Sequence, residues 1–179
     1  MSSYKILLVG PENSGKSTIA NFLAADGKGS IGSPDAKYEP TVGVRILEFD
    51  QAERVESKLS SSSTTSIELW DCSGRQEYEK CWPAIQDKAD GVILMFNPDN
   101  RAHSAQLELW YEYFVKRAGL SLSQVMVFAH RKMTQVGSSD IDRLIPRSLG
   151  SKIDKIYETD WGSTKRVREM FSRFVTSLK

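Results

Sequence analysis

The residues best suited to chemistry lie near the N-terminus, where Gly10 begins the segment Gly-Pro-Glu-Asn-Ser-Gly-Lys-Ser. The spacing G-x-x-x-x-G-K-S is that of a phosphate-binding loop, in which backbone N–H groups surround phosphate oxygens. In such a loop Lys16 neutralises the outer phosphates and the Ser17 hydroxyl binds Mg²⁺. A glycine turn that precedes a helix by chance is the alternative. Because every fixed position of the motif is filled, we predict that the chain binds a nucleotide.

The segments on both sides of this loop are those that the motif requires. Residues 5–9 form a short apolar run that predicts a buried strand, and residues 18–25 predict a helix. The start of that helix adds its dipole and its unpaired N–H groups to the phosphate site. The predicted nucleotide-binding residues here are Glu12, Asn13, Ser14, Gly15, Lys16, Ser17 and Thr18.

Further along the chain, predicted strands and helices alternate. The predicted strands are residues 45–49, 67–71, 91–96, 125–129 and 155–158, and the predicted helices are residues 105–116, a short one within 140–149, and 163–178. Residues 74–89 are expected to form a loop and an irregular helix broken near Pro83. This alternation predicts a parallel sheet with helices on both faces and one antiparallel hairpin around the serine-rich residues 60–65. Ligands of such sheets bind at the carboxyl ends of the strands, where the phosphate loop lies.

Length and composition limit the possible functions. A chain of 179 residues suits one hydrophobic core, so we expect a single domain over residues 1–179. The formal net charge of +1 gives no reason to expect a nucleic-acid partner. Cys72 and Cys81 lack the spacing of a zinc site, and no apolar signal segment is found at the N-terminus, so a reducing cytosolic compartment is expected. Without a myristoylatable second residue or a prenylatable cysteine at the C-terminus, no direct lipid anchor is expected.

A second group of residues distinguishes among the classes of nucleotide-binding protein. Asp71 and Gly74, in Trp-Asp-Cys-Ser-Gly, follow a predicted strand, where an aspartate can hold Mg²⁺ through water and a glycine N–H can reach the γ-phosphate. Pro-Thr-Val-Gly at residues 40–43 lies upstream. This order of parts resembles the Ras-superfamily small GTPases, particularly Rab and Arf proteins, over nearly the whole chain. The resemblance implies an α/β, three-layer G-domain fold with a mostly parallel six-stranded sheet, which binds GTP or GDP with Mg²⁺.

The resemblance also assigns roles to the two segments that change with nucleotide state. Thr41 is the threonine of the first switch, which contacts Mg²⁺ and the γ-phosphate only in the triphosphate state. Asp71 and Gly74 anchor the second switch, and the implied Mg²⁺ ligands are Ser17, Thr41 and Asp71. Loss of the γ-phosphate releases such segments, which makes the bound nucleotide a signal to partners.

Two positions near the expected γ-phosphate depart from the family. Most relatives have a glutamine after the glycine equivalent to Gly74, whereas this chain has Arg75 followed by Gln76. Either Arg75 stands at the catalytic position, or an extra residue places Gln76 there. We favour Arg75, because an inserted residue requires a bulge in a tightly positioned loop. Glu12 adds bulk and negative charge beside the γ-phosphate, so we predict very slow hydrolysis, about the unassisted small-GTPase rate or below.

The segment that reads the base departs further. Where the family has Asn-Lys-x-Asp, residues 130–133 are His-Arg-Lys-Met, and methionine cannot accept the hydrogen bonds of guanine. Arg131 can stack its guanidinium on the base, and His130 can supply a polar contact; a surface histidine without a ligand is the alternative. Asp160 and Trp161 stand where the family has its Ser-Ala-Lys segment. A guanine preference therefore follows from the resemblance and not from these residues.

Several segments narrow the resemblance to the Rab-like subunits of the intraflagellar transport B complex. They are Gly-Pro-Glu-Asn-Ser-Gly-Lys-Ser at 10–17, Ala-Asn-Phe-Leu at 20–23, Pro-Thr-Val-Gly-Val-Arg-Ile-Leu-Glu-Phe at 40–49, Glu-Leu-Trp-Asp-Cys at 68–72 and Cys-Trp-Pro-Ala at 81–84. This branch implies an unlipidated GTP-binding protein of the cytoplasm, the cilium or flagellum and its base. The implied partners are coiled-coil subunits of the complex.

Three functions stay open at this point. One is a binding module in which the triphosphate orders Thr41 and residues 74–89, and another is a P-loop enzyme that turns over as a GTPase or a small-molecule kinase. The third is a static subunit whose nucleotide stabilises the fold. We favour the binding module, since no arginine-rich kinase lid is present. Trp82 is a candidate aromatic contact for a partner, and a buried tryptophan beneath the second switch is the alternative.

Overall fold

The computed structural model describes residues 3–26, 31–32, 37–52, 64–132, 145–146, 149 and 153–178. One sheet has the strand order β2-β3-β1-β4-β5-β6. The strands are β1 (Ser3–Val9), β2 (Val44–Ala52), β3 (Thr64–Cys72), β4 (Gly91–Phe96), β5 (Val125–His130) and β6 (Ile156–Thr159). The β2–β3 pair is antiparallel, and the other four pairs are parallel. The predicted mostly parallel sheet with one antiparallel hairpin is therefore confirmed.

The helices differ from the prediction mainly at their ends. They are α1 (Lys16–Ala24), the 3₁₀ helix η1 (Gln76–Cys81), α2 (Trp82–Gln86), α3 (Arg101–Tyr111), the π-helix η2 (Glu112–Arg117), the 3₁₀ helix η3 (Leu122–Gln124) and α6 (Thr164–Ser177). The helix expected from residue 105 begins earlier because the Asn100 side chain caps it, accepting a hydrogen bond from Ala102 N at 3.0 Å. The short helix expected within 140–149 lies almost wholly outside the described residues. None of the described helices is long and apolar enough to cross a membrane.

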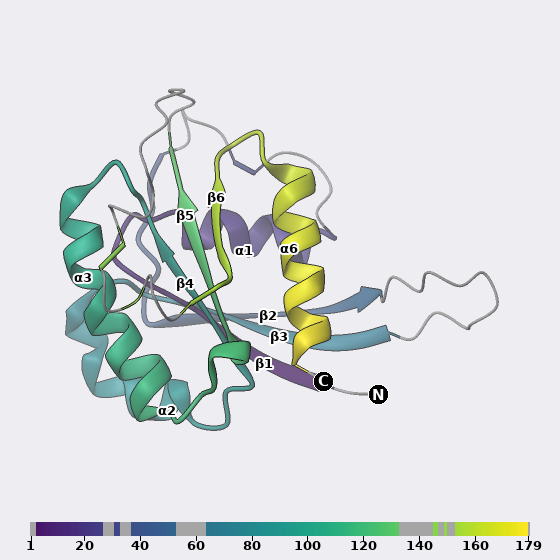
Figure 1. Cartoon of the computed structure of the whole chain (residues 1–179), viewed down its shortest axis with the longest axis horizontal. Helices are drawn as coiled ribbons and strands as arrows, with labels where there is room; N and C mark the ends of the chain where they lie inside the picture. The colour runs from purple at the N-terminus through teal and green to yellow at the C-terminus, as the bar shows by residue number, and fades with distance from the viewer. Residues whose placement is uncertain are drawn as a thin grey trace.

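Two apolar layers cover the faces of the sheet, because successive strand residues point to opposite sides. The α2, α3 and η2 helices pack on one face, and α1 and α6 pack on the other. In Figure 1 α3 lies to the left of the strands and the yellow α6 to the right. The predicted aromatic stripe of the third helical region is buried as expected, and its members are Leu107, Trp110, Tyr111 and Phe114.

Trp82 is a core residue, so of the two alternatives given for it the buried tryptophan is confirmed and the surface contact for a partner is not. Its side chain is 1% exposed. The ring lies 4.8 Å from that of Trp110 and 5.2 Å from that of Phe114, measured between centroids. Pro83 does not break this segment, since it occupies the first turn of α2, where a missing N–H is tolerated. The end of the segment that follows β3 is therefore anchored in the core.

The topology brings several loops to one edge of the sheet. Because β1, β3, β4, β5 and β6 run in the same direction, the segments that follow them start at the same edge. Leu8 pairs with Asp71 across β1 and β3, and His130 pairs with Thr159 across β5 and β6. The phosphate loop after β1, the Asp71–Gly74 segment and the loop after His130 therefore meet, as the sequence predicted.

Candidate functional site

The phosphate loop joins β1 to α1 with a strongly curved backbone. Asn13 has a φ of 59° and Gly15 a φ of 94°, both in the left-handed region. Left-handed residues in a short turn allow successive N–H groups to face one anion, and the first turn of α1 adds further free N–H groups. A side chain at Gly15 would place its Cβ 2.7 Å from Cδ2 of His130, so glycine is required there. The loop is therefore shaped to hold phosphate.

The ammonium group of Lys16 lies inside this loop. Lys16 is 5% exposed, and its Nζ donates to the carbonyl oxygens of Gly10 at 2.9 Å and Pro11 at 2.7 Å. Burial lowers the pKa of Lys16 to about 8, and the nearby charge of Asp71 opposes that shift. A cation removed from water gains from a bound anion, so the loop combines shape and charge for a phosphate group.

The predicted Mg²⁺ ligands lie together on one side of the loop. Oγ of Ser17 is 2.7 Å from Oγ1 of Thr41, which in turn lies 3.5 Å from Oδ2 of Asp71. Asp71 is fully buried, and within the described part of the chain its Oδ1 has no hydrogen-bond partner. Its Oδ2 is held by Arg45, with Nε at 3.1 Å. Hydroxyl and carboxylate oxygens are the ligands that Mg²⁺ prefers, and the unpartnered Oδ1 fits an ion or its water.

The segment after β3 lies directly against the phosphate loop. A Cβ on Gly74 would lie 2.3 Å from the backbone N of Glu12 and 2.5 Å from the carbonyl carbon of Pro11. Only glycine permits this approach. The N–H of Ser73 donates to the carbonyl oxygen of Gly43 at 2.7 Å, which ties the segment after β3 to the segment that contains Thr41. Both predicted switch segments therefore meet at the outer side of the phosphate loop.

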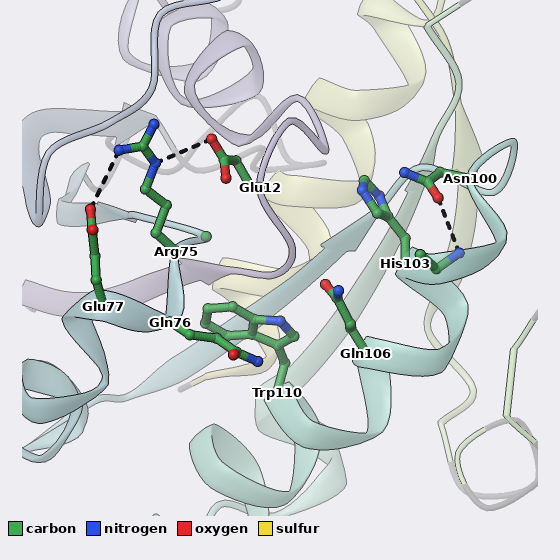
Figure 2. Close-up of a pocket in the computed structure, with 10 residues that line it drawn as sticks. Glu12, Arg75, Gln76, Glu77, Asn100, His103, Gln106 and Trp110 are labelled. Atoms are coloured by element: carbon green, nitrogen blue, oxygen red, sulfur yellow. Dashed lines mark hydrogen bonds and ion pairs between the residues drawn. The ribbon is translucent and has the colours of Figure 1, made fainter.

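Arg75 and Gln76 point in different directions. Nε of Arg75 lies 3.2 Å from Oε1 of Glu12, and its Nη1 lies 3.4 Å from Oε1 of Glu77. Figure 2 shows Arg75 extending toward Glu12, whereas Gln76 extends toward Trp110. Of the two candidates for the catalytic position, Arg75 is thus the one that reaches the phosphate loop.

His130 lies beneath the phosphate loop and not on the surface, so the alternative of a surface histidine is wrong. The residue is fully buried, its Nδ1 lies 3.1 Å from Oγ1 of Thr159, and its ring meets the edge of Trp161 at a centroid distance of 5.6 Å. Nε2 has no partner among the residues that the structure describes. Burial lowers the pKa of His130 to about 4, so the ring is neutral near pH 7. His130 therefore joins β5, β6 and the phosphate loop.

Arg131 joins neighbouring segments through two carboxylates, and its contact with the base stays a prediction. It is 8% exposed, and its guanidinium pairs with Asp99 and with Oε1 of Glu158, the latter at 2.5 Å from Nε. Its backbone N–H donates to the carbonyl oxygen of Thr159 at 2.8 Å. These contacts join β5 and β6 to the loop before α3. The guanidinium of Arg131 therefore has a structural role in holding these segments together.

Lys132 reaches the site from the described start of this loop, and the sequence analysis did not single it out. Its Nζ donates to Oδ1 of Asn13 in the phosphate loop and lies 5.6 Å from the centroid of the Tyr38 ring. The signal in the sequence is that Lys132 lies one position after the place of the lysine in the family's Asn-Lys-x-Asp motif. Met133, whose side chain was expected to lose contact with guanine, lies outside the described residues.

Asp160 and Trp161 play different parts in the loop after β6. Oδ1 of Asp160 accepts hydrogen bonds from the N–H of Gly162 at 2.9 Å and from Oγ of Ser163 at 2.7 Å, so the carboxylate shapes the turn before α6. Trp161 lies beside the start of α1, because a Cβ on Gly32 would be 2.6 Å from both Trp161 and Thr18. Its indole N–H donates to the carbonyl oxygen of Lys132. Trp161 thus provides an aromatic ring next to the loop, suited to stacking on a base.

The buried His130 predicts a loss of stability in acid. Because its folded-state pKa is about 4 and its ordinary value is 6.5, the unfolded chain binds the extra proton between these values. The free energy of unfolding should therefore fall as the pH falls from 6.5 to 4, by up to about 3 kcal/mol from this residue. The nearby charges of Asp160 and Lys132 act on the His130 pKa in opposite directions. Urea unfolding at several pH values measures the slope.

The variant His130→Asn removes this titration and keeps a group that can bond to Thr159. We expect a shallower dependence of the unfolding free energy on pH below 6.5 than in the wild type. The other histidine, His103, is also buried with a pKa lowered mainly by burial, so His103→Asn is the matched comparison, with a smaller expected flattening. Equal slopes in the wild type and His130→Asn would contradict the prediction.

Comparisons with known proteins identify relatives of this chain. The family model "Ras of Complex, Roc, domain of DAPkinase" matches residues 5–133. The intraflagellar transport protein 22 homolog of Homo sapiens is 41% identical over 179 residues, which cover 99% of this chain and 91% of that protein. The Danio rerio homolog is 38% identical over 175 residues, with 98% and 89% covered. A GTP-bound crystal structure of T. brucei IFT22/74/81 contains a chain with a TM-score of 0.69 and 29% identity, which covers 99% of this chain and 97% of that one.

Proposed function

The chain belongs to the family of intraflagellar transport protein 22 homologs and carries a Ras-like domain, and from this premise we propose that it is a GTP-binding subunit of the intraflagellar transport B complex. The observation that carries the proposal is the convergence of Lys16, Ser17, Thr41 and Asp71 at the phosphate loop. Mg²⁺, when bound, would neutralise negative charge on the nucleotide phosphates. In this proposal Ser17, Thr41 and Asp71 hold that ion.

The protein's own residues then account for binding of the triphosphate. Lys16 and the N–H groups at the start of α1 hold the phosphates, and the neighbouring Thr41 and Gly74 contact the outermost one. The hydrogen bond between Ser73 and Gly43 couples the two segments. Gain of the outer phosphate therefore orders a joint surface, which is how a nucleotide becomes a signal to a partner.

Slow hydrolysis is part of the proposal. A guanidinium donates hydrogen bonds but accepts none, so Arg75 cannot orient a water molecule through an accepting oxygen as glutamine does. The Glu12 carboxylate, 3.2 Å from Arg75 Nε, adds negative charge where the reaction already concentrates it. Turnover assisted by another protein and a static subunit stabilised by nucleotide are the two alternatives.

The proposed partners are the coiled-coil subunits of the transport complex. Support comes from the matched T. brucei assembly, which contains IFT22 together with IFT74 and IFT81, and from the names of the relatives. The proposed location is the cytoplasm and the cilium or flagellum with its base. Nucleic acid and a direct lipid anchor are not part of the proposal.

Nucleotide content and single-turnover hydrolysis test this function together. We expect GTP in the purified protein and phosphate release at or below about 10⁻⁴ s⁻¹. Arg75→Gln should raise that rate, because it supplies an accepting oxygen and removes the pair with Glu12. Lys80→Gln, an exposed substitution in η1, is the control and should leave the rate unchanged.

Rapid phosphate release by the wild type would contradict slow hydrolysis, and bound ADP or ATP would contradict the guanine assignment. The same preparations, loaded with triphosphate, diphosphate or no nucleotide, distinguish a switch from a static subunit. Equal affinity of all three for the coiled-coil partner would support the static subunit.

A further inference from the structure

One carboxylate oxygen of Glu12 accepts hydrogen bonds from both predicted switch segments. Oε1 of Glu12 accepts a hydrogen bond from the Tyr38 hydroxyl at 3.2 Å and from Nε of Arg75 at 3.2 Å. Figure 2 shows the Arg75 side of this arrangement, with the guanidinium between Glu12 and Glu77. Tyr38 precedes Thr41 in the first segment, and Arg75 follows Gly74 in the second. The two segments and the phosphate loop therefore meet at a single anionic group.

The position of that group is the outer side of the phosphate loop. The backbone N of Glu12 is the atom that would clash with a side chain at Gly74. Lys16 donates to the carbonyl oxygens of Gly10 and Pro11, the two residues before Glu12. Glu12 thus follows the two residues that hold the Lys16 ammonium group and lies against Gly74, the glycine that is proposed to serve the outermost phosphate.

We propose that the Glu12 carboxylate substitutes for the terminal phosphate when that phosphate is absent, by holding Tyr38 and Arg75 over the phosphate loop. In this way Glu12 sets how well the protein distinguishes a nucleoside triphosphate from a nucleoside diphosphate. This inference rests on the proposed function, because it assumes that guanine nucleotides bind at the loop. It gives Glu12 a role in the choice between GTP and GDP, in addition to its effect on the hydrolysis rate.

Charge and access both support this role. A terminal phosphate brings about two negative charges beside the carboxylate, and like charges at short range weaken binding. Because the Glu12 side chain is 43% exposed, water and salt screen part of this repulsion. Arg75 is 40% exposed and, together with Glu12 and Gly74, borders an open cavity of about 540 Å³ that extends to His103 and Trp110, so its guanidinium is not packed into the core.

Affinity for triphosphate and diphosphate, measured by calorimetry on the full chain, tests the proposal. Glu12→Gln keeps the size of the side chain and removes its charge, so it should raise the ratio of the GDP to the GTP dissociation constant about tenfold. Glu77→Gln is the matched control, because it removes the same charge from the other partner of Arg75 outside the phosphate loop. We expect less than a twofold change in the ratio for Glu77→Gln.

Amide hydrogen exchange with GDP bound provides a second measurement, which charge repulsion against the terminal phosphate alone would leave unchanged. With GDP bound, the amides of residues 41–44 and 74–78 should exchange about tenfold faster in Glu12→Gln than in the wild type, because a neutral amide oxygen holds Tyr38 and Arg75 more weakly than a carboxylate does. With GTP bound, the two proteins should exchange alike. Tyr38→Phe, which removes one of the two hydrogen bonds, should fall between them with GDP.

Two outcomes would overturn the inference: an unchanged dissociation-constant ratio in Glu12→Gln, or equal exchange of the two proteins with GDP bound. Failure of the wild type to bind either guanine nucleotide would instead overturn the proposed function. In that case, amide exchange measured without nucleotide in the wild type and in Glu12→Gln still tests whether the carboxylate holds Tyr38 and Arg75. Equal rates there would overturn the inference as well.

Discussion

Lys16→Met should lower the affinity for GTP and GDP by about 100- to 1,000-fold, because it removes a buried cation and its charge-assisted hydrogen bonds to phosphate. Nζ of Lys16 donates to the carbonyl oxygens of Gly10 and Pro11, so it lies within the loop that is proposed to receive the phosphates. Methionine has a similar length and no charge. Calorimetry measures the affinity, and the urea midpoint of the nucleotide-free variant shows that it folds.

The control Lys165→Met removes an exposed charge from α6, outside the phosphate loop, and should bind nucleotide as the wild type does. A second test uses the pKa of Lys16, which burial lowers to about 8. Phosphates raise this pKa, so above pH 8 binding takes up a proton and the dissociation constant rises by up to about tenfold per pH unit. Lys16→Met should lose that dependence. Affinity within about threefold of the wild type would show that nucleotide binds elsewhere.

The parts of the site that could be predicted from the sequence are those set by local spacing. A strand, a glycine loop and a helix are consecutive in the chain, so the loop of Lys16 and Ser17 follows from the motif alone. Asp71 was predicted because it ends a strand parallel to β1, and parallel strands deliver their ends to one edge. The 3.6-residue period of α3 likewise predicted its buried face.

The contacts that could not be predicted join segments far apart in the chain. Glu12 meets Arg75 and Tyr38, and Lys132 meets Asn13, through side chains whose directions no local pattern specifies. Arg131 could not be separated from a base-stacking residue by its type, because its role depends on the two carboxylates that the fold brings to it. Burial of His130 depends in the same way on the neighbouring phosphate loop.

Trp82→Ala should lower the free energy of unfolding by about 3–5 kcal/mol, a large part of the 5–15 kcal/mol of a typical domain. The indole is 1% exposed and lies in an aromatic cluster with Trp110, Tyr113 and Phe114. Removal of the ring leaves a cavity that the neighbouring rings of α3 and η2 fill only in part. Trp82→Phe keeps one ring and should lose roughly half as much. Urea unfolding measures both variants.

The control is Leu109→Ala, because Leu109 lies on α3 near the cluster but is 41% exposed. Its loss should stay within about 1 kcal/mol, as for most surface substitutions. Unchanged stability in Trp82→Ala would contradict the core assignment.

Trp82 also marks the end of the predicted second switch. The helix η1 has no buried residue, whereas α2 begins with the buried Trp82. Movement that follows the nucleotide should therefore be confined to residues 74–81, and in Trp82→Ala amide exchange in α2 should rise toward that of η1.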